Sequence, residues 1–191
     1  MTDTDTPTAA APAVDDTPIM HLSGAIQFHL GPDLVTLPCP KIGQLRRLRD
    51  AHHAANDRVR ETHAEFETQR QAILDELSQM QQRLTSADTD DDGIAAAADA
   101  KEKLVGLQLR LEALTRDATR KAQDVGFDAA VGWFRLALDV LSSIRVADPA
   151  PGEDVPDGVL AVDDLPGWMS QLGTARKFME HWMTHPSPRG I

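Results

Sequence analysis

The stretch "SADTDDDGIAAAADAKEK", Ser86–Lys103, lies between two long segments of helical periodicity and decides how they are connected. Before it, from Ile42 to about Leu84, a stripe follows alternating three- and four-residue steps, with polar residues at three of its positions, His52, Thr62 and Gln69. Its apolar residues are Leu45, Leu48, Ala55, Val59, Phe66, Ile73, Leu77, Met80 and Leu84. After it, the same steps give Leu104, Leu107, Leu111, Leu114, Ala118 and Val125. Two striped helices joined by a short polar loop are typical of an antiparallel helical hairpin, so we expect this stretch to form its tip.

The acidic part of the stretch also matches the template of a calcium-binding loop, with Gly93 at the sixth position. The first, third, fifth and twelfth positions are occupied by Asp88, Asp90, Asp92 and Asp99. Three features argue against calcium. The twelfth residue is Asp rather than Glu, the following alanines favour helix, and the chain has no second loop of this kind. We therefore prefer a solvated tip in which Asp92 caps the second helix.

The residues before the first helix predict a β-hairpin. In "GAIQFHLGPDLVTLPCP" (24–40) apolar and polar residues alternate, and "GPD" is a turn signal. Two strands alone are marginal in water, so we expect the hairpin to pack on a helix. Residues 1–19, rich in Thr, Ala, Pro and Asp, are expected to form a disordered arm.

The residues after the helical hairpin predict three further parts. An apolar segment from Phe127 to Ile144 predicts a third helix, which completes a domain of residues 20–145. Residues 146–163, rich in Pro, Gly and acids, predict a linker. Residues 164–191 predict a short helix capped by Asp164, with Pro166 in its first turn. The predicted fold is mainly α, with an N-terminal β-hairpin, a long antiparallel helical hairpin, a third apolar helix and a linker-tethered C-terminal helix.

The composition limits the classes of function. Acidic residues outnumber basic ones by 30 to 19, and the net charge of −11 disfavours general binding to nucleic acid. We find no apolar run of about 18 residues that would cross a membrane, and the first residues lack the features of a signal peptide. The single cysteine, Cys39, excludes an internal disulfide and fits a reducing compartment.

The sequence predicts neither catalysis nor a cofactor. His181 and His185 are spaced like two zinc ligands on one helix face, but no further ligand is spaced to complete a site. Cys39 lies between two prolines, with no base or oxyanion hole indicated. Four basic residues could dock an acidic partner, although a solvated helix face is the preferred interpretation. These residues are Lys41, Arg46, Arg47 and Arg49.

The C-terminal segment carries large apolar residues that can dock either on the rest of the chain or on a partner. The polar linker is not expected to hold the segment rigidly, and Trp is enriched among residues that dominate interfaces. We therefore expect a partner-binding element. Its candidate residues are Leu165, Pro166, Trp168, Phe178, His181 and Trp182.

The stretches "DLPGWMSQ" (164–171) and "FMEHWMTHPSPRG" (178–190) resemble the C-terminal signature of tail assembly chaperones from long-tailed, siphovirus-type actinobacteriophages. Those chains often carry an "LP-W" element, then "HW", a proline and "RG". The matching residues are Leu165, Pro166, Trp168, His181, Trp182, Pro186, Arg189 and Gly190. A hairpin that leads into an "LGQLRRL"-like helix is also common there, and this chain has "LVTLPCPKIGQLRRLRDA" (34–51). The long helices and acidic tip between the two signatures depart from the pattern.

The resemblance implies a non-enzymatic function in phage assembly. Such chaperones bind the very long tape measure protein and keep it soluble until tail tube subunits polymerise around it. They act in the host cytoplasm, are absent from the virion, and often have a frameshifted longer form, of which this chain would be the short counterpart. Self-association into a homo-oligomer is a further expectation. The alternatives are a structural phage protein or coiled-coil adaptor, and a calcium-binding helical module.

Overall fold

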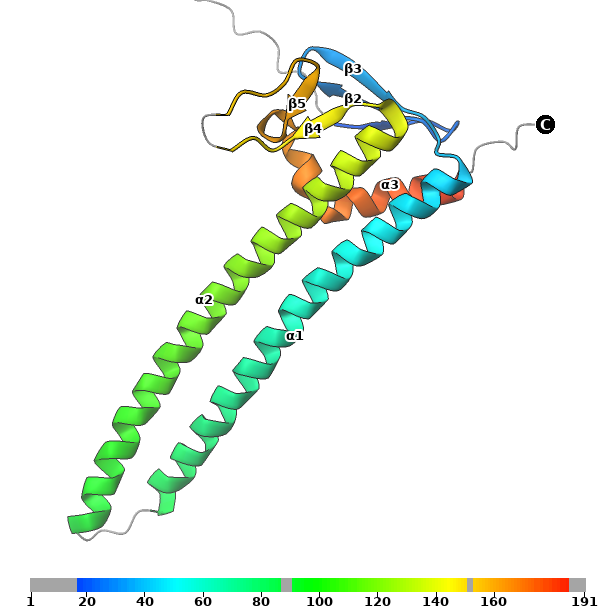
Figure 1. The fold of residues 1–191 in the computed structure, drawn as a ribbon. Helices are drawn as coiled ribbons and strands as arrows, with labels where there is room; N and C mark the ends of the chain where they lie inside the picture. Colours follow the sequence, from blue (N-terminus) through cyan, green and yellow to red (C-terminus); the bar gives the residue numbers. More distant parts are fainter. Residues whose placement is uncertain (1–16, 87–90, 151–152, 186–191) are drawn as a thin grey trace, which may run out of the picture.

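The computed structural model describes residues 17–86, 91–150 and 153–185 (Figure 1). Two long antiparallel helices, α1 (Ile42–Ser86) and α2 (Asp91–Ser142), lie side by side. The remaining elements gather at the end where α1 begins and α2 ends. We call residues 59–86 and 91–126 the stalk and the other described residues the head. The predicted mainly α architecture, with its hairpin of strands, its pair of long helices and its C-terminal helix, is confirmed.

The helix predicted from Phe127 to Ile144 needs correction, because these residues continue α2 as far as Ser142. A single glycine such as Gly126 costs a helix only about 1 kcal/mol, and packing of the apolar residues beyond it outweighs that cost. α2 ends because Ser143 takes a left-handed φ of 59°, and its N–H donates to the Asp139 carbonyl at 3.2 Å.

Three antiparallel strands form a small sheet in the order β1-β2-β3. β2 (Ile26–Leu30) and β3 (Asp33–Leu37) are the predicted hairpin, joined through Gly31, whose φ of 59° is accessible to glycine. β1 (Ile19–Met20) adds a third strand at the end of the predicted arm. Residues 1–16 of that arm lie outside the described residues.

The segment predicted to be a linker contains secondary structure. β4 (Arg145–Ala147) pairs in parallel with β5 (Val159–Ala161), and the 3-10 helices η1 (Val162–Asp164) and η2 (Gly167–Ser170) follow. α3 (Leu172–Thr184) begins eight residues beyond the predicted cap at Asp164, so that prediction is wrong. Leu165 precedes a proline and is extended, which stops a helix from running on at this point.

The core of the head lies between the sheet, the end of α2 and α3. The sheet contributes one face, because alternate side chains of a strand point the same way. The buried aromatic and aliphatic residues come from six elements, β2, β3, α1, α2, η2 and α3. They include Ile26, Phe28, Leu37, Leu48, Trp133, Phe134, Leu138, Met169, Phe178 and Trp182. α3 crosses both long helices below the sheet (Figure 1). The Trp133 Nε1–H donates to the Leu48 carbonyl at 2.9 Å and joins α2 to α1 inside this core.

Candidate functional site

Three of the predicted partner-binding residues come together in the head. Phe178 and Trp182 are fully buried on α3, and Trp168 is half-buried on η2. The Trp182 ring lies 6.0 Å from that of Trp133, and the Trp168 ring lies 5.1 Å from that of Phe28. Of the two docking options open to this segment, the structure therefore shows the one on its own chain. Phe178 and Trp182 cannot meet a partner unless the head opens.

His181 occupies a tightly packed corner between α3 and the turn that joins β1 to β2. Its ring lies 4.7 Å from that of His185. Burial, followed by the neighbouring His185, lowers the pKa of His181, while backbone hydrogen bonds to the β1–β2 turn act in the opposite direction. Cys39 Sγ donates to the His185 carbonyl at 3.1 Å, and a Cβ on Gly24 would lie 2.8 Å from that same oxygen. The corner thus joins the first turn of the sheet to the end of α3.

A second histidine, His52, lies where the head meets the stalk. Its Nδ1 pairs with the side-chain amide of Asn56 at 2.8 Å. Burial, and then the charges of His53 and Arg176, lower the pKa of His52, whereas Glu180 acts to raise it. The lowered pKa favours a neutral imidazole at this junction.

The calcium candidates at the tip are only partly described. Asp88 and Asp90 lie outside the described residues, and α2 begins at Asp91, one residue before the predicted cap Asp92. Asp99 is exposed and accepts a hydrogen bond from Lys103 Nζ at 2.7 Å. Within the described residues, no three His, Cys, Asp or Glu side chains are placed to hold a metal ion. The same range holds no helix that is both long and apolar enough to cross a membrane.

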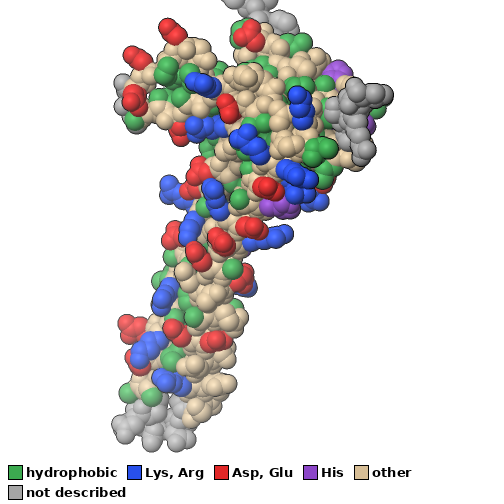
Figure 2. All heavy atoms as spheres, turned by 45° about the vertical axis from the view of Figure 1, so that its right-hand side comes forward, with side chains coloured by type: hydrophobic (Ala, Val, Ile, Leu, Met, Phe, Trp, Pro, Cys, Tyr) green, Lys and Arg blue, Asp and Glu red, His purple; other side chains and the backbone are tan. Residues whose placement is uncertain are grey.

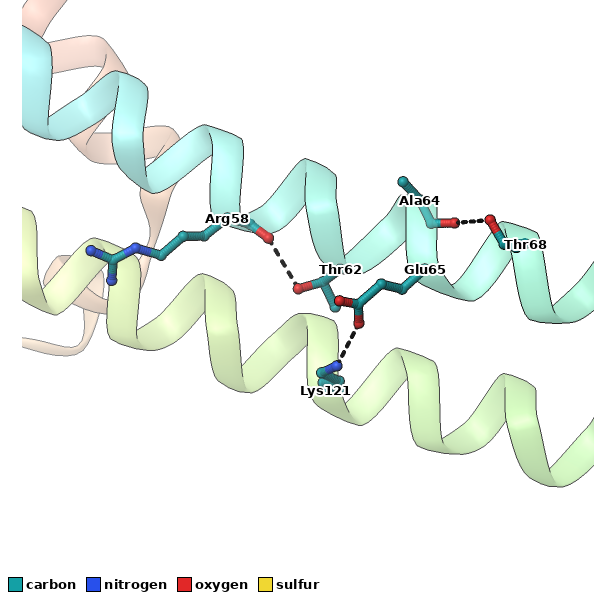
Figure 3. Close-up of polar contacts among 6 residues, drawn as sticks. All are labelled: Arg58, Thr62, Ala64, Glu65, Thr68 and Lys121. Atoms are coloured by element: carbon teal, nitrogen blue, oxygen red, sulfur yellow. Dashed lines mark hydrogen bonds and ion pairs between the residues drawn. The ribbon is translucent and has the colours of Figure 1, made fainter.

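The stalk is held by one seam between α1 and α2. Of its seam residues only Ile73 and Ala100 are buried, while the leucines and Phe66 are half-buried. Among the described side chains, one ion pair crosses the seam, between Glu65 Oε2 and Lys121 Nζ at 2.8 Å (Figure 3). The Thr62 and Thr68 hydroxyls beside it donate to carbonyls of their own helix, so they do not join the two helices.

The outer face of α2 carries a second apolar stripe, which we define as Ile94, Val105 and Leu109. These side chains are 61%, 56% and 61% exposed. Their separations of eleven and four residues place them within about 60° of each other on a helix, roughly opposite the seam. Figure 2 shows hydrophobic side chains exposed at intervals among the charges of the stalk. In the stalk part of α1, no large hydrophobic side chain of the described residues is exposed to this degree.

A hollow of about 500 Å³ lies between the two helices, on the side of α2 away from this stripe. Its apolar lining comes from Met80, Gly106 and Leu107. A Cβ on Gly106 would meet no atom within 4 Å, so this flank of α2 is open. The stripe therefore gives α2 exposed apolar surface in addition to the face that packs on α1.

The head has a larger hollow of about 630 Å³ between α2 and the segment from β4 to η2. Leu165 and Pro166, two further predicted partner-binding residues, line it, and both are half-buried. The sequence interpretation chose these residues for the "LP-W" signature but missed Phe127, Val131 and the stripe on α2. Phe127 and the stripe are exposed and Val131 is buried. Which residues of α2 are exposed depends on the helix face that meets α1 and on the elements that cover the rest, and a single seam pattern reveals neither.

The basic residues near the start of α1 stay on the surface. Lys41, Arg46, Arg47 and Arg49 are exposed, and Arg49 lies 3.7 Å from its neighbour Asp50. None of these four side chains lines either of the two hollows described above. Their exposure agrees with the preferred interpretation of a solvated face.

The chain was compared with known protein families, curated proteins and solved structures. The chain matches no protein-family model, no curated protein and no solved structure.

Proposed function

We propose that this chain is a non-enzymatic tail assembly chaperone of a long-tailed phage, which binds the tape measure protein and keeps it soluble in the host cytoplasm. The sequence resemblance suggests the family. The observation that supports a binding role is the exposed stripe of Ile94, Val105 and Leu109 on the stalk. A helix with apolar residues on two faces is usually covered on both of them.

The stalk, rather than the C-terminal tryptophans, is the proposed client surface. A client helix that lies lengthwise along α2 can cover the stripe over its whole extent, about 22 Å for fifteen residues. The open flank at Gly106 lies about 60° around the helix from Leu109 and leaves room for side chains of that helix. Contacts of this kind depend on apolar area more than on sequence, which suits a long and repetitive helical client. A frameshifted longer form would carry the same stalk.

The test is co-expression of the full chain with the tape measure protein of the same phage. Val105→Asp with Leu109→Asp places two charges on the stripe, and we expect recovery of soluble, co-purified client to fall at least tenfold. Both positions are exposed, so the melting temperature of the chaperone should stay within a few degrees of the wild type. Unchanged recovery of the client would contradict the proposed surface.

A matched control uses the outer face of α1. Ser78→Asp with Gln82→Asp adds the same two charges at the same spacing on an exposed and polar face. We expect this variant to recover the client at the wild-type level. If it reduces recovery as strongly as the change on α2, the effect is one of net charge and the stripe is not a binding surface.

The continuous two-helix seam also suits a second function, that of a structural phage protein or coiled-coil adaptor. The two functions differ in where the protein ends up, because a chaperone is left out of the finished particle. Mass spectrometry of purified virions separates them. Detection of this chain at stoichiometric levels would favour the structural role.

A further inference from the structure

The 630 Å³ hollow in the head is lined by both apolar and charged side chains. Val131 of α2 and Met169 of η2 are among its lining residues but are buried, so the apolar surface that an occupant can reach comes from residues such as the half-buried Leu165. Phe127 stands at its mouth with 52% of its surface exposed. A volume of this size is within the range of sites that enclose a ligand or a few side chains of a partner. The exposed Phe127 adds apolar area that an occupant can cover.

The charges around the mouth are unbalanced. Three carboxylates line the hollow, from Asp128, Asp148 and Asp163, against one guanidinium, from Arg135. Within the described residues, none of these four side chains forms an ion pair. Accessible apolar side chains beside a net negative charge are complementary to an apolar group flanked by cations.

We propose that this hollow binds a segment of a partner protein in which one large apolar side chain lies between basic residues. The apolar side chain packs against Phe127 and Leu165, the flanking Lys or Arg side chains reach Asp128 and Asp163, and Arg135 donates to a backbone carbonyl of the segment. Residues 1–16 of the chain itself have the wrong charge for this role, since they include four Asp and no Lys or Arg. This site is separate from the stalk surface and does not depend on the proposed function.

Gly132 offers a way to fill the hollow without disturbing the fold. It lines the hollow, and a Cβ built on it would meet no atom within 4 Å. Gly132→Leu therefore extends a side chain into open space while improving the helix propensity of α2. Gly126→Leu is the matched control, because Gly126 is also an α2 glycine with open space around it but does not line the hollow.

The experiment measures fluorescence anisotropy of three labelled peptides with the full chain at about 0.1 M salt. The probes are Gly-Lys-Lys-Leu-Lys-Lys-Gly, the same peptide with Gly in place of Leu, and Gly-Glu-Glu-Leu-Glu-Glu-Gly. We expect the first to bind at least ten times more tightly than the other two. The Gly-centred peptide reports general attraction of a cation to an acidic protein, so equal binding of the two basic peptides would overturn the proposal.

The variants locate the binding. Gly132→Leu should weaken the leucine peptide at least tenfold, and Gly126→Leu should leave it unchanged. Asp128→Asn with Asp163→Asn should reduce the preference for basic over acidic peptide at least fivefold. Full binding to Gly132→Leu would place the peptide elsewhere and overturn the site. So would a wild-type dimer in sedimentation that becomes a monomer on Gly132→Leu, because the occupant would then be a second copy.

Discussion

The head and the stalk are built largely from the same two helices but are stabilised in different ways. In the head, the ends of α1 and α2 are covered by the sheet and by α3, and every one of the largest fully buried side chains lies there. In the stalk, the same helices have only each other, and Ile73 and Ala100 are the buried residues of the described range. Helix pairs therefore need a third layer before their seam is removed from water.

This difference separates stability from binding. The head uses its aromatic residues to hold its own layers together, including those that the sequence suggested for a partner. The stalk keeps apolar surface exposed and contributes less to folding. Mutations should therefore have large structural effects in the head and small ones in the stalk.

The largest loss in the free energy of unfolding is expected from Trp182→Ala. Trp182 is fully buried against Trp133 and Phe178, and removing a side chain of this size from a core typically costs about 3–5 kcal/mol. Urea unfolding followed by tryptophan fluorescence measures the loss. Met183→Ala changes the next residue of α3, which is exposed, and should cost less than about 0.5 kcal/mol. Similar values for the two variants would mean that α3 does not pack as described.

A smaller effect is expected from Leu111→Asp in the stalk seam. Leu111 is half-buried, so its replacement by a carboxylate should cost about 1–3 kcal/mol and lower the helical signal in circular dichroism before the head melts. Leu109→Asp makes the same change two residues away on the exposed stripe and should cost less than about 0.5 kcal/mol. Equal losses for the two variants would show that the seam is misplaced.

The pH should affect the head through its two histidines of lowered pKa, His181 and His52. Because the folded pKa lies below the ordinary value of about 6.5, the unfolded chain binds more protons between the two values. Stability from these groups is therefore complete above about pH 6.5 and is lost as the pH falls through the folded pKa. Urea midpoints measured from pH 8 to pH 5 check this. A double variant, His181→Gln with His52→Gln, should flatten the profile, and an unchanged slope would assign it to other groups.

The smallest loss in the free energy of unfolding is expected when the ion pair between Glu65 and Lys121 is removed. Both side chains are 61% exposed, and pairs of this kind contribute about 0.2–1 kcal/mol. Lys121→Gln should lower the stability within that range, and the loss should disappear near 1 M salt because exposed charges are screened. A double-mutant cycle with Glu65→Gln isolates the pair. A coupling above about 2 kcal/mol would mean that the stalk depends on this contact.

The parts of the fold that depend on local pattern were predictable from the sequence. The seam from Leu45 to Val125 and the alternation from Ile26 to Leu30 each repeat within a few residues, so the helical hairpin and the β-hairpin followed directly. The limits of the helices were harder. Gly126 looks like a boundary in the sequence, but a lone glycine is a weak helix breaker when apolar residues on both sides pack.

The position of the C-terminal aromatic residues could not be predicted in the same way. Trp168 meets Phe28, and Trp182 meets Trp133, and such pairs leave no periodic signal because they join distant segments. The stripe on α2 was not predicted for another reason. Its three residues are spread over four turns, and such a sparse set cannot be distinguished from scattered apolar surface residues until the seam is located.

The location of α3 sets the order in which the chain can fold. The stalk joins residues on either side of a short tip, so it can close as soon as both helices have been synthesised. The head must bring together residues such as Cys39 and His185, which are 146 positions apart. During synthesis the inner face of the sheet and the end of α2 therefore remain exposed to solvent. α3 can pack on them only after the other elements have emerged from the ribosome.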